Sequence, residues 1–289
     1  MCMDRFYIIT NSLKDKELLV TKKIKNYLLA HGKSCMIQEE KGLGKRQKYR
    51  FTDADLIPEE TQCIIVVGGD GTLIQAARDT IDKQIPLLGV NLGTLGYLTA
   101  VETHNTDWAL DNLMMDKYYL EKRMMIKGRA YRGSMKLVED IALNDIVIGR
   151  YGHIRMVNFK IYVNGEFLHS YDADGIIVST ATGSTGYSLS VGGPIVAPHS
   201  MMILVTPVAP HTLNSRSIVL SSHDKIEIEV GEGRKLDEEE VEVAFDGDAF
   251  MRMVTGDRLI VEKADKDTKL LKISHTSFLQ VLREKIGNS

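Results

Sequence analysis

The sequence has few cysteines, little net charge and no long apolar run. Its three cysteines, Cys2, Cys35 and Cys63, lie far apart and form no Cys-x-x-Cys pair. This excludes a disulfide framework or a zinc knuckle and indicates free thiols in a reducing compartment. No apolar run approaches the ~20 residues that cross a bilayer, and the acidic residue before the short apolar stretch at the start is unlike a secretory signal. The net charge of -3 provides no basic field for nucleic acid or an anionic membrane. We therefore predict a cytoplasmic globular protein that binds no nucleic acid and no membrane.

Several motifs of catalysis and metal binding are also missing. No Gly-Lys-Ser/Thr follows a glycine-rich turn at Walker A spacing, and the turn after residues 63–67 does not match the Gly-x-Gly-x-x-Gly of dehydrogenases. Ser184 does not lie in Gly-x-Ser-x-Gly, so a hydrolase nucleophile elbow is not indicated. The eight histidines show no His-x-x-x-His or His-Glu-x-x-His spacing, so we predict no permanent metal site.

The pattern of apolar residues divides the chain into two halves. Its 289 residues suggest two domains, or one large one, against a prior of ~150 residues per domain. In the first half, short apolar runs alternate with helical spacing, which is typical of a parallel α/β unit. Predicted strands cover 5–10, 63–67 and 86–90, and predicted helices cover 20–28 and 73–81.

From about residue 123 the pattern changes to the alternation of antiparallel strands. Asn164-Gly165 predicts a hairpin turn after a strand at 157–163. Further strands are predicted at 226–230, 241–245 and 259–261. The second half is therefore expected to be mostly antiparallel sheet.

The last residues predict an amphipathic helix. Ser277 and Gln280 form a capping-box pattern at its start. Phe278, Leu282 and Ile286 share one helical face. We expect this face to pack back on the body of the protein.

The sharpest local motif is Gly68-Gly69-Asp70-Gly71-Thr72, between a predicted strand and a predicted helix. Glycines let a ligand approach the backbone closely, and the N–H groups at a helix start favour anions. A phosphate chain suits this loop, but a bare carboxylate beside phosphates is repulsive. Asp70 is explained if it holds Mg²⁺ or accepts a proton from a hydroxyl that attacks phosphorus.

Two further loops contain candidate binding residues. Asn91, Gly93 and Gly96 follow the next predicted strand, and consecutive parallel strands end at the same carboxyl edge, where open α/β sheets bind ligands. In the second half, the strand at 174–178 runs into a loop rich in Ser, Thr and Gly at 179–188. Such short donors and acceptors suit a neutral polar ligand such as a ribose or a base, although a plain hairpin loop explains them equally well.

Taken together, these motifs closely resemble the NAD kinase family. The resemblance runs from Gly-Gly-Asp-Gly through Asn-x-Gly-x-x-Gly-Tyr-Leu, Ala142-Leu143-Asn144-Asp145 and Thr182-Gly183-Ser184-Thr185 to Phe245-Asp246-Gly247. Gly-Gly-Asp-Gly is shared with phosphofructokinases and diacylglycerol kinases, whereas the ordered combination is highly specific.

The resemblance implies a fold, an activity and a set of ligands. The fold is an α/β, Rossmann-like N-terminal domain (1–122), a β-rich, sandwich-like NAD-binding domain (123–268) and a C-terminal segment (269–289) that returns to the first domain. The activity is transfer of the γ-phosphoryl of ATP, or a phosphoryl of polyphosphate, to the 2′-hydroxyl of the adenosine ribose of NAD, with NAD in the cleft. Mg²⁺ or another divalent cation arrives with the donor, and the protein is a homodimer or homotetramer.

The resemblance also implies roles for individual residues. Asp70 matches the catalytic general base for the 2′-hydroxyl. Asn144 and Asp145 match the pair that holds the adenosine end; the family often has Glu where Asp145 stands, which shortens the reach toward the ribose. Asp174 matches a carboxylate near the dinucleotide and the neighbouring subunit, and Tyr187 matches an aromatic side chain at a subunit contact.

The remaining implied nucleotide-binding positions line the loops described above. Those that match the adenine-reading stretch are Thr182, Thr185 and Gly186. The others are Gly68, Gly69, Gly71, Thr72, Asn91, Gly93, Ser190, Ala209, His211 and Asp246.

Two alternatives stay open from the sequence. A lipid kinase of the diacylglycerol kinase type shares the glycine-Asp loop and a β-rich second domain, but the polar loop at 179–188 suits a dinucleotide better than an acyl chain. A non-catalytic nucleotide sensor could share the fold, although binding alone does not require Asp70. The donor, the choice between NAD and NADH, the number of subunits and any allosteric control are not determined by the sequence.

Overall fold

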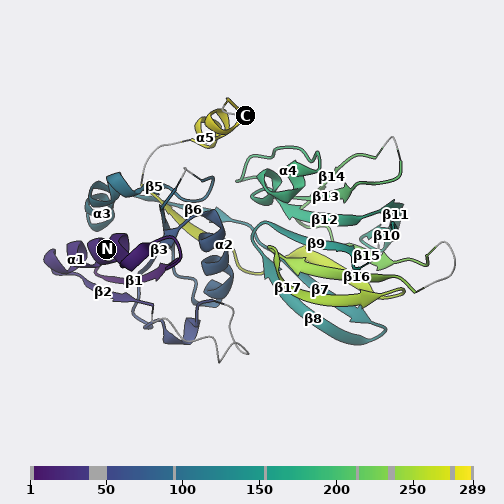
Figure 1. Cartoon of the computed structure of the whole chain (residues 1–289), viewed down its shortest axis with the longest axis horizontal. Helices are drawn as coiled ribbons and strands as arrows, with labels where there is room; N and C mark the ends of the chain where they lie inside the picture. The colour runs from purple at the N-terminus through teal and green to yellow at the C-terminus, as the bar shows by residue number, and fades with distance from the viewer. Residues whose placement is uncertain are drawn as a thin grey trace. The chain divides into compact units, whose positions relative to one another are not determined.

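The computed structural model describes residues 3–38, 51–93, 96–152, 155–212, 215–233, 238–273 and 277–287 (Figure 1). The chain divides into two compact units. Unit 1 combines Met1–Lys122 with Thr268–Ser289, and unit 2 is Arg123–Asp267. Within the described ranges, no helix is both long and apolar enough to cross a membrane.

Unit 1 contains a seven-stranded sheet in the order β2-β1-β3-β4-β19-β6, with β5 paired to β4. Its strands are β1 (Arg5–Thr10), β2 (Ser34–Ile37), β3 (Cys63–Gly68), β4 (Leu87–Asn91), β5 (Val101–Glu102), β6 (Tyr119–Arg123) and β19 (Thr268–Lys272). The pairs around β1, β3 and β4 are parallel. Every residue of β3 and β4 is buried, as expected for central strands covered on both faces. The predicted parallel α/β unit is thus confirmed. The family resemblance implied that the C-terminal segment returns to the first domain, but not that part of it, β19, forms a strand of this sheet beside β4.

Helices cover both faces of this sheet. Its helices are α1 (Leu19–Ala30), α2 (Asp70–Asp79), α3 (Thr106–Met114) and α5 (Phe278–Gly287), with short 3-10 turns at η1 (Lys16–Leu18), η3 (Ala54–Leu56), η4 (Ile81–Lys83) and η5 (Thr103–Asn105). Apolar residues of α1 and α3 share one core cluster with Ile65 and Leu88. On the opposite face of β4, Gly89 faces Leu73 of α2: a Cβ on Gly89 would lie 2.6 Å from a methyl carbon of Leu73. The sheet is therefore the centre of a three-layer α/β fold.

The C-terminal helix corrects one detail of the sequence analysis. The predicted cap is present, because the backbone N–H of Gln280 donates to Ser277 Oγ at 3.2 Å. The helix belongs to unit 1, and the ring of Phe278 lies 6.0 Å from that of Tyr97. However, the buried residue is Val281, and Ile286 is 58% exposed. The expected apolar face is thus wrong at its far end, where Ile286 is exposed and the neighbouring Lys285 places its Nζ 5.4 Å from the centroid of the Tyr97 ring.

Unit 2 consists of two six-stranded antiparallel sheets. One sheet has the order β11-β10-β15-β18-β7-β8 and the other β14-β13-β12-β9-β16-β17. The strands are β7 (Ile126–Arg132), β8 (Met135–Ala142), β9 (Asp145–Arg150), β10 (Val157–Val163), β11 (Glu166–Ala173), β12 (Gly175–Thr180), β13 (Met202–Val208), β14 (Ile218–Ser221), β15 (Ile226–Val230), β16 (Glu240–Phe245), β17 (Asp248–Val254) and β18 (Arg258–Lys263). Two short helical segments, η6 (Gly183–Thr185) and α4 (Tyr187–Ser190), follow β12. One core cluster takes residues from both sheets, including the large buried rings of Phe159 and Phe245. The predicted β-rich, sandwich-like architecture is confirmed.

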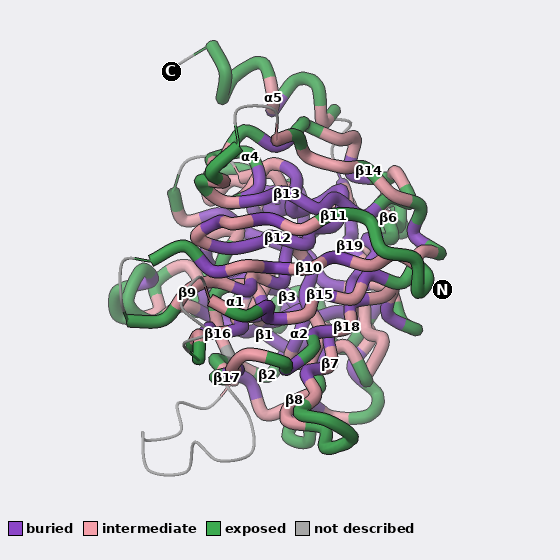
Figure 2. The backbone as a smooth tube through the Cα atoms, turned by 90° about the vertical axis from the view of Figure 1, so that its right-hand side faces the viewer, coloured by how far each residue is buried: buried purple, intermediate pink, exposed green. Residues whose placement is uncertain are grey.

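Two tight hairpins set the strand register in unit 2. Asn164 and Gly165 have φ values of 53° and 85°, which fit the left-handed positions of a type I′ turn and confirm the predicted hairpin. Asp246 and Gly247 have φ values of 50° and 75° and connect β16 to β17 in the same way. Buried residues are concentrated on the central strands in both units (Figure 2).

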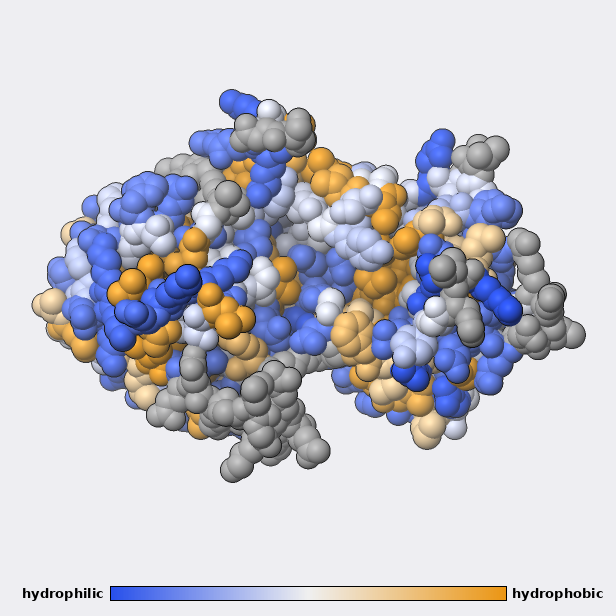
Figure 3. All heavy atoms as spheres, in the orientation of Figure 1, coloured by the Kyte–Doolittle hydropathy of each residue, from blue (hydrophilic) through white to orange (hydrophobic). Residues whose placement is uncertain are grey.

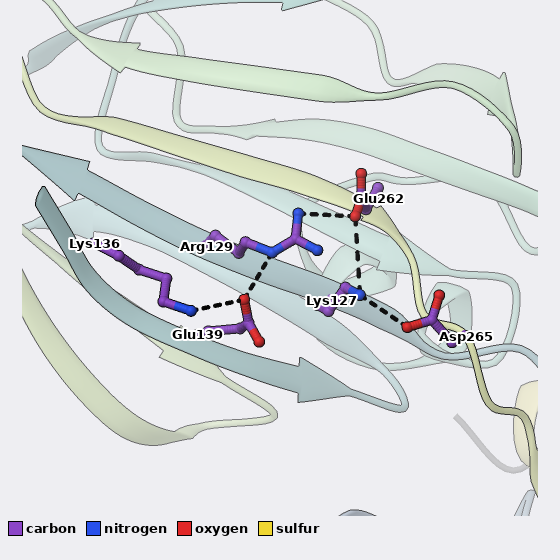
Figure 4. Close-up of polar contacts among 6 residues, drawn as sticks. All are labelled: Lys127, Arg129, Lys136, Glu139, Glu262 and Asp265. Carbon is purple, nitrogen blue, oxygen red and sulfur yellow. Dashed lines mark hydrogen bonds and ion pairs between the residues drawn. The ribbon is translucent and has the colours of Figure 1, made fainter. Parts of the chain in front are cut away.

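The outer face of the first sheet of unit 2 carries a paired network of charges (Figure 4). Arg129 on β7 contacts Glu139 at 2.8 Å and Glu262 at 2.9 Å. Lys136 contacts Glu139 at 3.2 Å, and the Lys127 ammonium lies 3.0 Å from the carboxylate of Asp265. Hydrogen bonds from Lys136 and Arg129 hold the pKa of Glu139 below its usual range. The charged face formed by these residues is typical of the solvated side of an antiparallel sheet. On the surface shown in Figure 3, hydrophilic residues lie among hydrophobic ones.

Candidate functional site

The glycine loop of unit 1 lies where β3 meets α2. Gly68 ends the strand, Gly69 precedes the helix and Asp70 is its first residue. A Cβ on Gly68 would lie 2.9 Å from Thr72 Cγ2 and closer still to Cβ and Oγ1, so this position has no room for a side chain. Gly71 is exposed, with no atom within 4 Å of the position of a Cβ. The loop is therefore closed beneath Gly68 and open at Gly71, where the first N–H groups of α2 can meet an anion.

Residues after β1 border the same loop. Asn11 donates from Nδ2 to Thr72 Oγ1 at 3.2 Å, so the buried Thr72 hydroxyl is engaged within the protein. A Cβ on Gly69 would lie 3.5 Å from the Lys14 ammonium. An exposed cation thus lies beside the open side of the loop.

The carboxylate of Asp70 is held by a turn that follows β4. Its Oδ2 accepts the N–H of Tyr97 at 2.7 Å, and its Oδ1 accepts the N–H of Leu98 at 3.2 Å. Oδ1 also accepts the N–H and the hydroxyl of Thr99, at 3.1 and 3.2 Å. Asp70 itself is half-buried. Sequence reasoning identified Asp70 but missed these partners, because nothing in the spacing of residues 96–99 indicates which side chain they meet.

The second glycine-rich exit lies beside the first, as predicted. The N–H of Leu92 donates to the carbonyl of Gly68 at 2.9 Å, which joins the ends of β3 and β4. The buried side chain of Asn91 bonds to the backbone of Gly93 in both directions, at 3.0 and 3.2 Å. Asn91 therefore shapes its own turn, while Gly93 is exposed. Thr94 and Leu95 lie outside the described residues.

In unit 2 the Asn144-Asp145 pair is held by the carboxylate of Asp246. Asp246 accepts the N–H groups of Leu143 at 2.8 Å, Asn144 at 2.7 Å and Asp145 at 3.1 Å. The N–H of Asp246 donates in turn to the carbonyl of Asp145 at 2.9 Å. This half-buried carboxylate is thus used to fix the backbone of the pair.

Buried polar atoms around this pair lack partners. Asn144 Oδ1 and Ser179 Oγ have no hydrogen-bond partner among the described residues, and Ser179 lies opposite Asp145 in the β9–β12 ladder. Asp145 is 6% exposed. Burial, and then the nearby charge of Asp246, raise the pKa of Asp145 to about 7. Buried polar groups in native proteins are normally bonded, so this cluster is suited to a polar ligand.

The loop after β12 packs against the same pair. Thr180 donates its hydroxyl to the carbonyl of Leu143 at 2.6 Å and accepts the N–H of Gly183 at 3.1 Å. A Cβ on Gly183 would lie 2.8 Å from Asn144 Cα and closer still to its carbonyl. Thr182 accepts a bond from the buried Arg123 at 3.3 Å, a residue that the sequence analysis did not identify.

The next residues of the loop extend the site. The hydroxyl of Thr185 donates to the carbonyl of Thr182 at 3.3 Å. The Cβ position of Gly186 lies 3.6 Å from Asn144 Nδ2 and 3.8 Å from Asp145 Oδ2. Tyr187 and Ser190, on α4, are exposed. Ser184 is fully buried and bonds to the backbone of Ala181 and Val196, in agreement with the absence of a nucleophile elbow.

Three predicted site residues lie at the other end of β12. Asp174 precedes this strand, and its carboxylate pairs with Arg150 at 3.0 Å. The N–H of Asp174 donates to the carbonyl of Val208 at 2.9 Å, next to the exposed Ala209 and His211. β12 has six residues, so about 20 Å separate this group from Asn144 and Thr182. The structure does not bring the two groups together within one chain.

No group of three or more His, Cys, Asp or Glu side chains in the described ranges is placed to hold a metal ion. At the glycine loop Asp70 offers a carboxylate, but its Oδ1 already accepts three hydrogen bonds from described residues. The residues therefore fit a cation that is held mainly by other ligands, such as phosphate oxygens.

Family models and relatives match both halves of the chain. The model of the ATP-NAD kinase N-terminal domain matches residues 6–118, and that of the ATP-NAD kinase C-terminal domain matches residues 143–273. The chain is 45% identical to a NAD kinase of Lachnospira eligens (98% of this chain, 100% of the relative) and 46% identical to one of Agathobacter rectalis (99% of each).

Solved structures share the fold. A yeast NADH kinase complexed with NADH has a TM-score of 0.84 at 22% identity, covering 99% of this chain and 88% of that one. An NAD kinase from Archaeoglobus fulgidus in complex with ATP has a TM-score of 0.77 at 22% identity, covering 99% of both. With both halves of the sequence matched and relatives of over 40% identity along nearly the whole length, the chain belongs to the NAD kinase family.

Proposed function

We propose that this chain phosphorylates NAD to NADP, with ATP as phosphoryl donor and Asp70 as the base that accepts the proton of the 2′-hydroxyl of the adenosine ribose. The observation that carries the proposal is the Asp70 carboxylate, fixed by hydrogen bonds at the start of α2 beside the open Gly71. Family membership supports the activity and ATP as donor.

The roles of unit 1 follow from the charge of a triphosphate. The N–H groups at the start of α2, with Gly69 and Gly71 leaving the backbone accessible, would bind the phosphates. Lys14, beside the loop, adds a positive charge. A divalent cation, Mg²⁺ or another, would arrive bound to the phosphate oxygens and neutralise part of their charge. Because phosphoryl transfer depends mostly on positioning, a carboxylate held in one orientation is what the reaction requires.

The roles of unit 2 follow from its unpartnered polar atoms. Asn144 and Asp145, held by Asp246, would hydrogen-bond the adenosine, with Asp145 on ribose hydroxyls. Thr182, Thr185 and Gly186 would line the adenine. A neutral, hydroxyl-rich loop suits this ligand because it offers donors and acceptors without net charge.

We further propose a homodimer or homotetramer in the cytoplasm. Asp174, Ala209 and His211 lie about 20 Å along β12 from Asn144. In an oligomer, these three residues of one copy would lie near the adenosine bound by a neighbouring copy. The exposed Tyr187 would lie at the contact between the copies. The buried free thiols of Cys35 and Cys63 fit a reducing compartment.

The activity is tested by incubating the protein and its Asp70→Asn variant with NAD, Mg²⁺ and a panel of donors (ATP, other triphosphates and polyphosphate), with products identified by mass spectrometry. We expect NADP from the parent and none above background from Asp70→Asn, while NAD binding measured by calorimetry is retained. NADP formation by Asp70→Asn near the parental rate would remove Asp70 from the reaction. NAD binding without any product would favour a nucleotide sensor, and phosphorylation of diacylglycerol in a parallel reaction would favour a lipid kinase.

A further inference from the structure

The turn at residues 96–99 is built around the carboxylate of Asp70. Three backbone N–H groups and one hydroxyl converge on this one side chain, at 2.7 to 3.2 Å. A carboxylate that accepts this many bonds cannot rotate about its last bond without breaking several of them. Of the four donors, the Thr99 hydroxyl is the one that belongs to a side chain, and Thr99 is 2% exposed.

Gly96 is required by the same carboxylate. A Cβ on Gly96 would lie 2.5 Å from Asp70 Oδ2 and closer still to Oδ1 and Cγ. The need for glycine comes from the space that Asp70 occupies.

The two oxygens of Asp70 are bonded unequally. Within the part of the chain that the structure describes, Oδ1 accepts three hydrogen bonds and Oδ2 accepts one, from Tyr97. A carboxylate oxygen has two lone-pair directions, so Oδ1 is saturated and Oδ2 has one direction left. A proton leaving a substrate hydroxyl can therefore be accepted at Oδ2.

We infer that Gly96 and Thr99 are positioning residues for phosphoryl transfer: they hold Asp70 so that Oδ2 faces the acceptor hydroxyl. The inference rests on the proposed role of Asp70. As the 2′-hydroxyl oxygen bonds to the γ-phosphorus of ATP, the bond from that phosphorus to the bridging oxygen of ADP breaks and ADP leaves, while the O–H bond breaks and the proton moves to Oδ2. Fixed geometry of the base matters because phosphoryl transfer depends mostly on positioning.

The test compares Thr99→Val with Thr99→Ser in steady-state kinetics. Valine keeps the shape of threonine without its hydroxyl, so we expect kcat to fall about tenfold, the effect of one bond to a charged acceptor. The KM values for NAD and ATP should stay within about twofold, because the loss concerns the transition state alone. Serine keeps the hydroxyl and should restore kcat.

A matched control is Thr80→Val. Thr80 is also buried, and its hydroxyl donates to the carbonyl of Ala76 at 2.7 Å, but it lies at the other end of α2, about 15 Å from Asp70. This variant should keep the parental kcat. Gly96→Ala, which pushes the carboxylate itself, should lower kcat roughly 100-fold, as expected when a catalytic group is misplaced by about 1 Å.

Three results would overturn the inference. They are a parental kcat in Thr99→Val, an equal loss in Thr99→Ser, and a rise in KM with kcat unchanged. A different result would refute the proposed role of Asp70 as the base: formation of NADP by the Asp70→Asn variant. An inactive Asp70→Asn together with a fully active Thr99→Val would reject the positioning role and keep the base.

Discussion

Replacing Asp145 with asparagine should change how the stability of unit 2 depends on pH. Burial and the nearby charge of Asp246 raise the pKa of Asp145 from 3.8 to about 7. Between these values the folded protein keeps the proton and the unfolded chain has lost it. Asp145 therefore contributes stability that is fully present below pH ~4 and is lost as the pH rises toward 7.

The size of this effect follows from the shift. One pKa unit corresponds to about 1.36 kcal/mol. With values of 3.8 and about 7, Asp145 lowers the free energy of unfolding by about 3 kcal/mol between pH 5 and pH 8. Asparagine does not ionise, so the gain in stability on Asp145→Asn should be larger at pH 8 than at pH 5 by about 3 kcal/mol. The other titrating groups are the same in the parent and in Asp145→Asn, so their contributions cancel when the two free energies of unfolding are subtracted.

The assay must report on unit 2. The fluorescence of the single tryptophan, Trp108, reports on α3 of unit 1, so we would measure hydrogen exchange of the amides of β9 and β12 by mass spectrometry at both pH values. Asp265→Asn is the control, since Asp265 is 87% exposed and Lys127 lowers its pKa. The contribution of Asp265 to the free energy of unfolding changes with pH only below pH ~4. The substitution Asp265→Asn should therefore change this free energy equally at pH 5 and pH 8. The reasoning is refuted if Asp145→Asn also changes stability equally at the two pH values.

Two other substitutions test contacts that position the loops. Gly183→Ala should raise the KM for NAD about tenfold, because its Cβ would overlap the backbone of Asn144; an unchanged KM in steady-state kinetics would contradict this. Ser277→Ala removes the hydroxyl that caps Gln280 and should destabilise α5 by about 1 kcal/mol. Hydrogen exchange of residues 278–287 should then become faster while β3 and β4 keep their protection, and uniform loss across unit 1 would show a different cause.

Local patterns predicted the elements of this protein well. The buried run from Cys63 to Val67 became the central strand β3, and the alternation at 157–163 became β10, with Asn164-Gly165 as its turn. These predictions depend on neighbours in sequence, because periodicity and turn residues act over a few positions. The helix at 278–287 was predicted, but its buried residue, Val281, was not, since burial depends on what the helix meets.

The sequence by itself determined the two kinds of sheet, the shared edge of the two glycine-rich exits and the place of Asp70 after a strand, and its resemblance to a family singled out Asn144-Asp145. The tertiary structure alone decided what those side chains meet. Asp70 bonds to residues 27 to 29 positions away, and Asp246 to residues 101 to 103 positions away. Likewise, β12 separates Asp174 from Thr182. Hydrogen bonds, burial and charge act between atoms that the folded chain brings close, and no local pattern records which distant backbone N–H will face a given carboxylate.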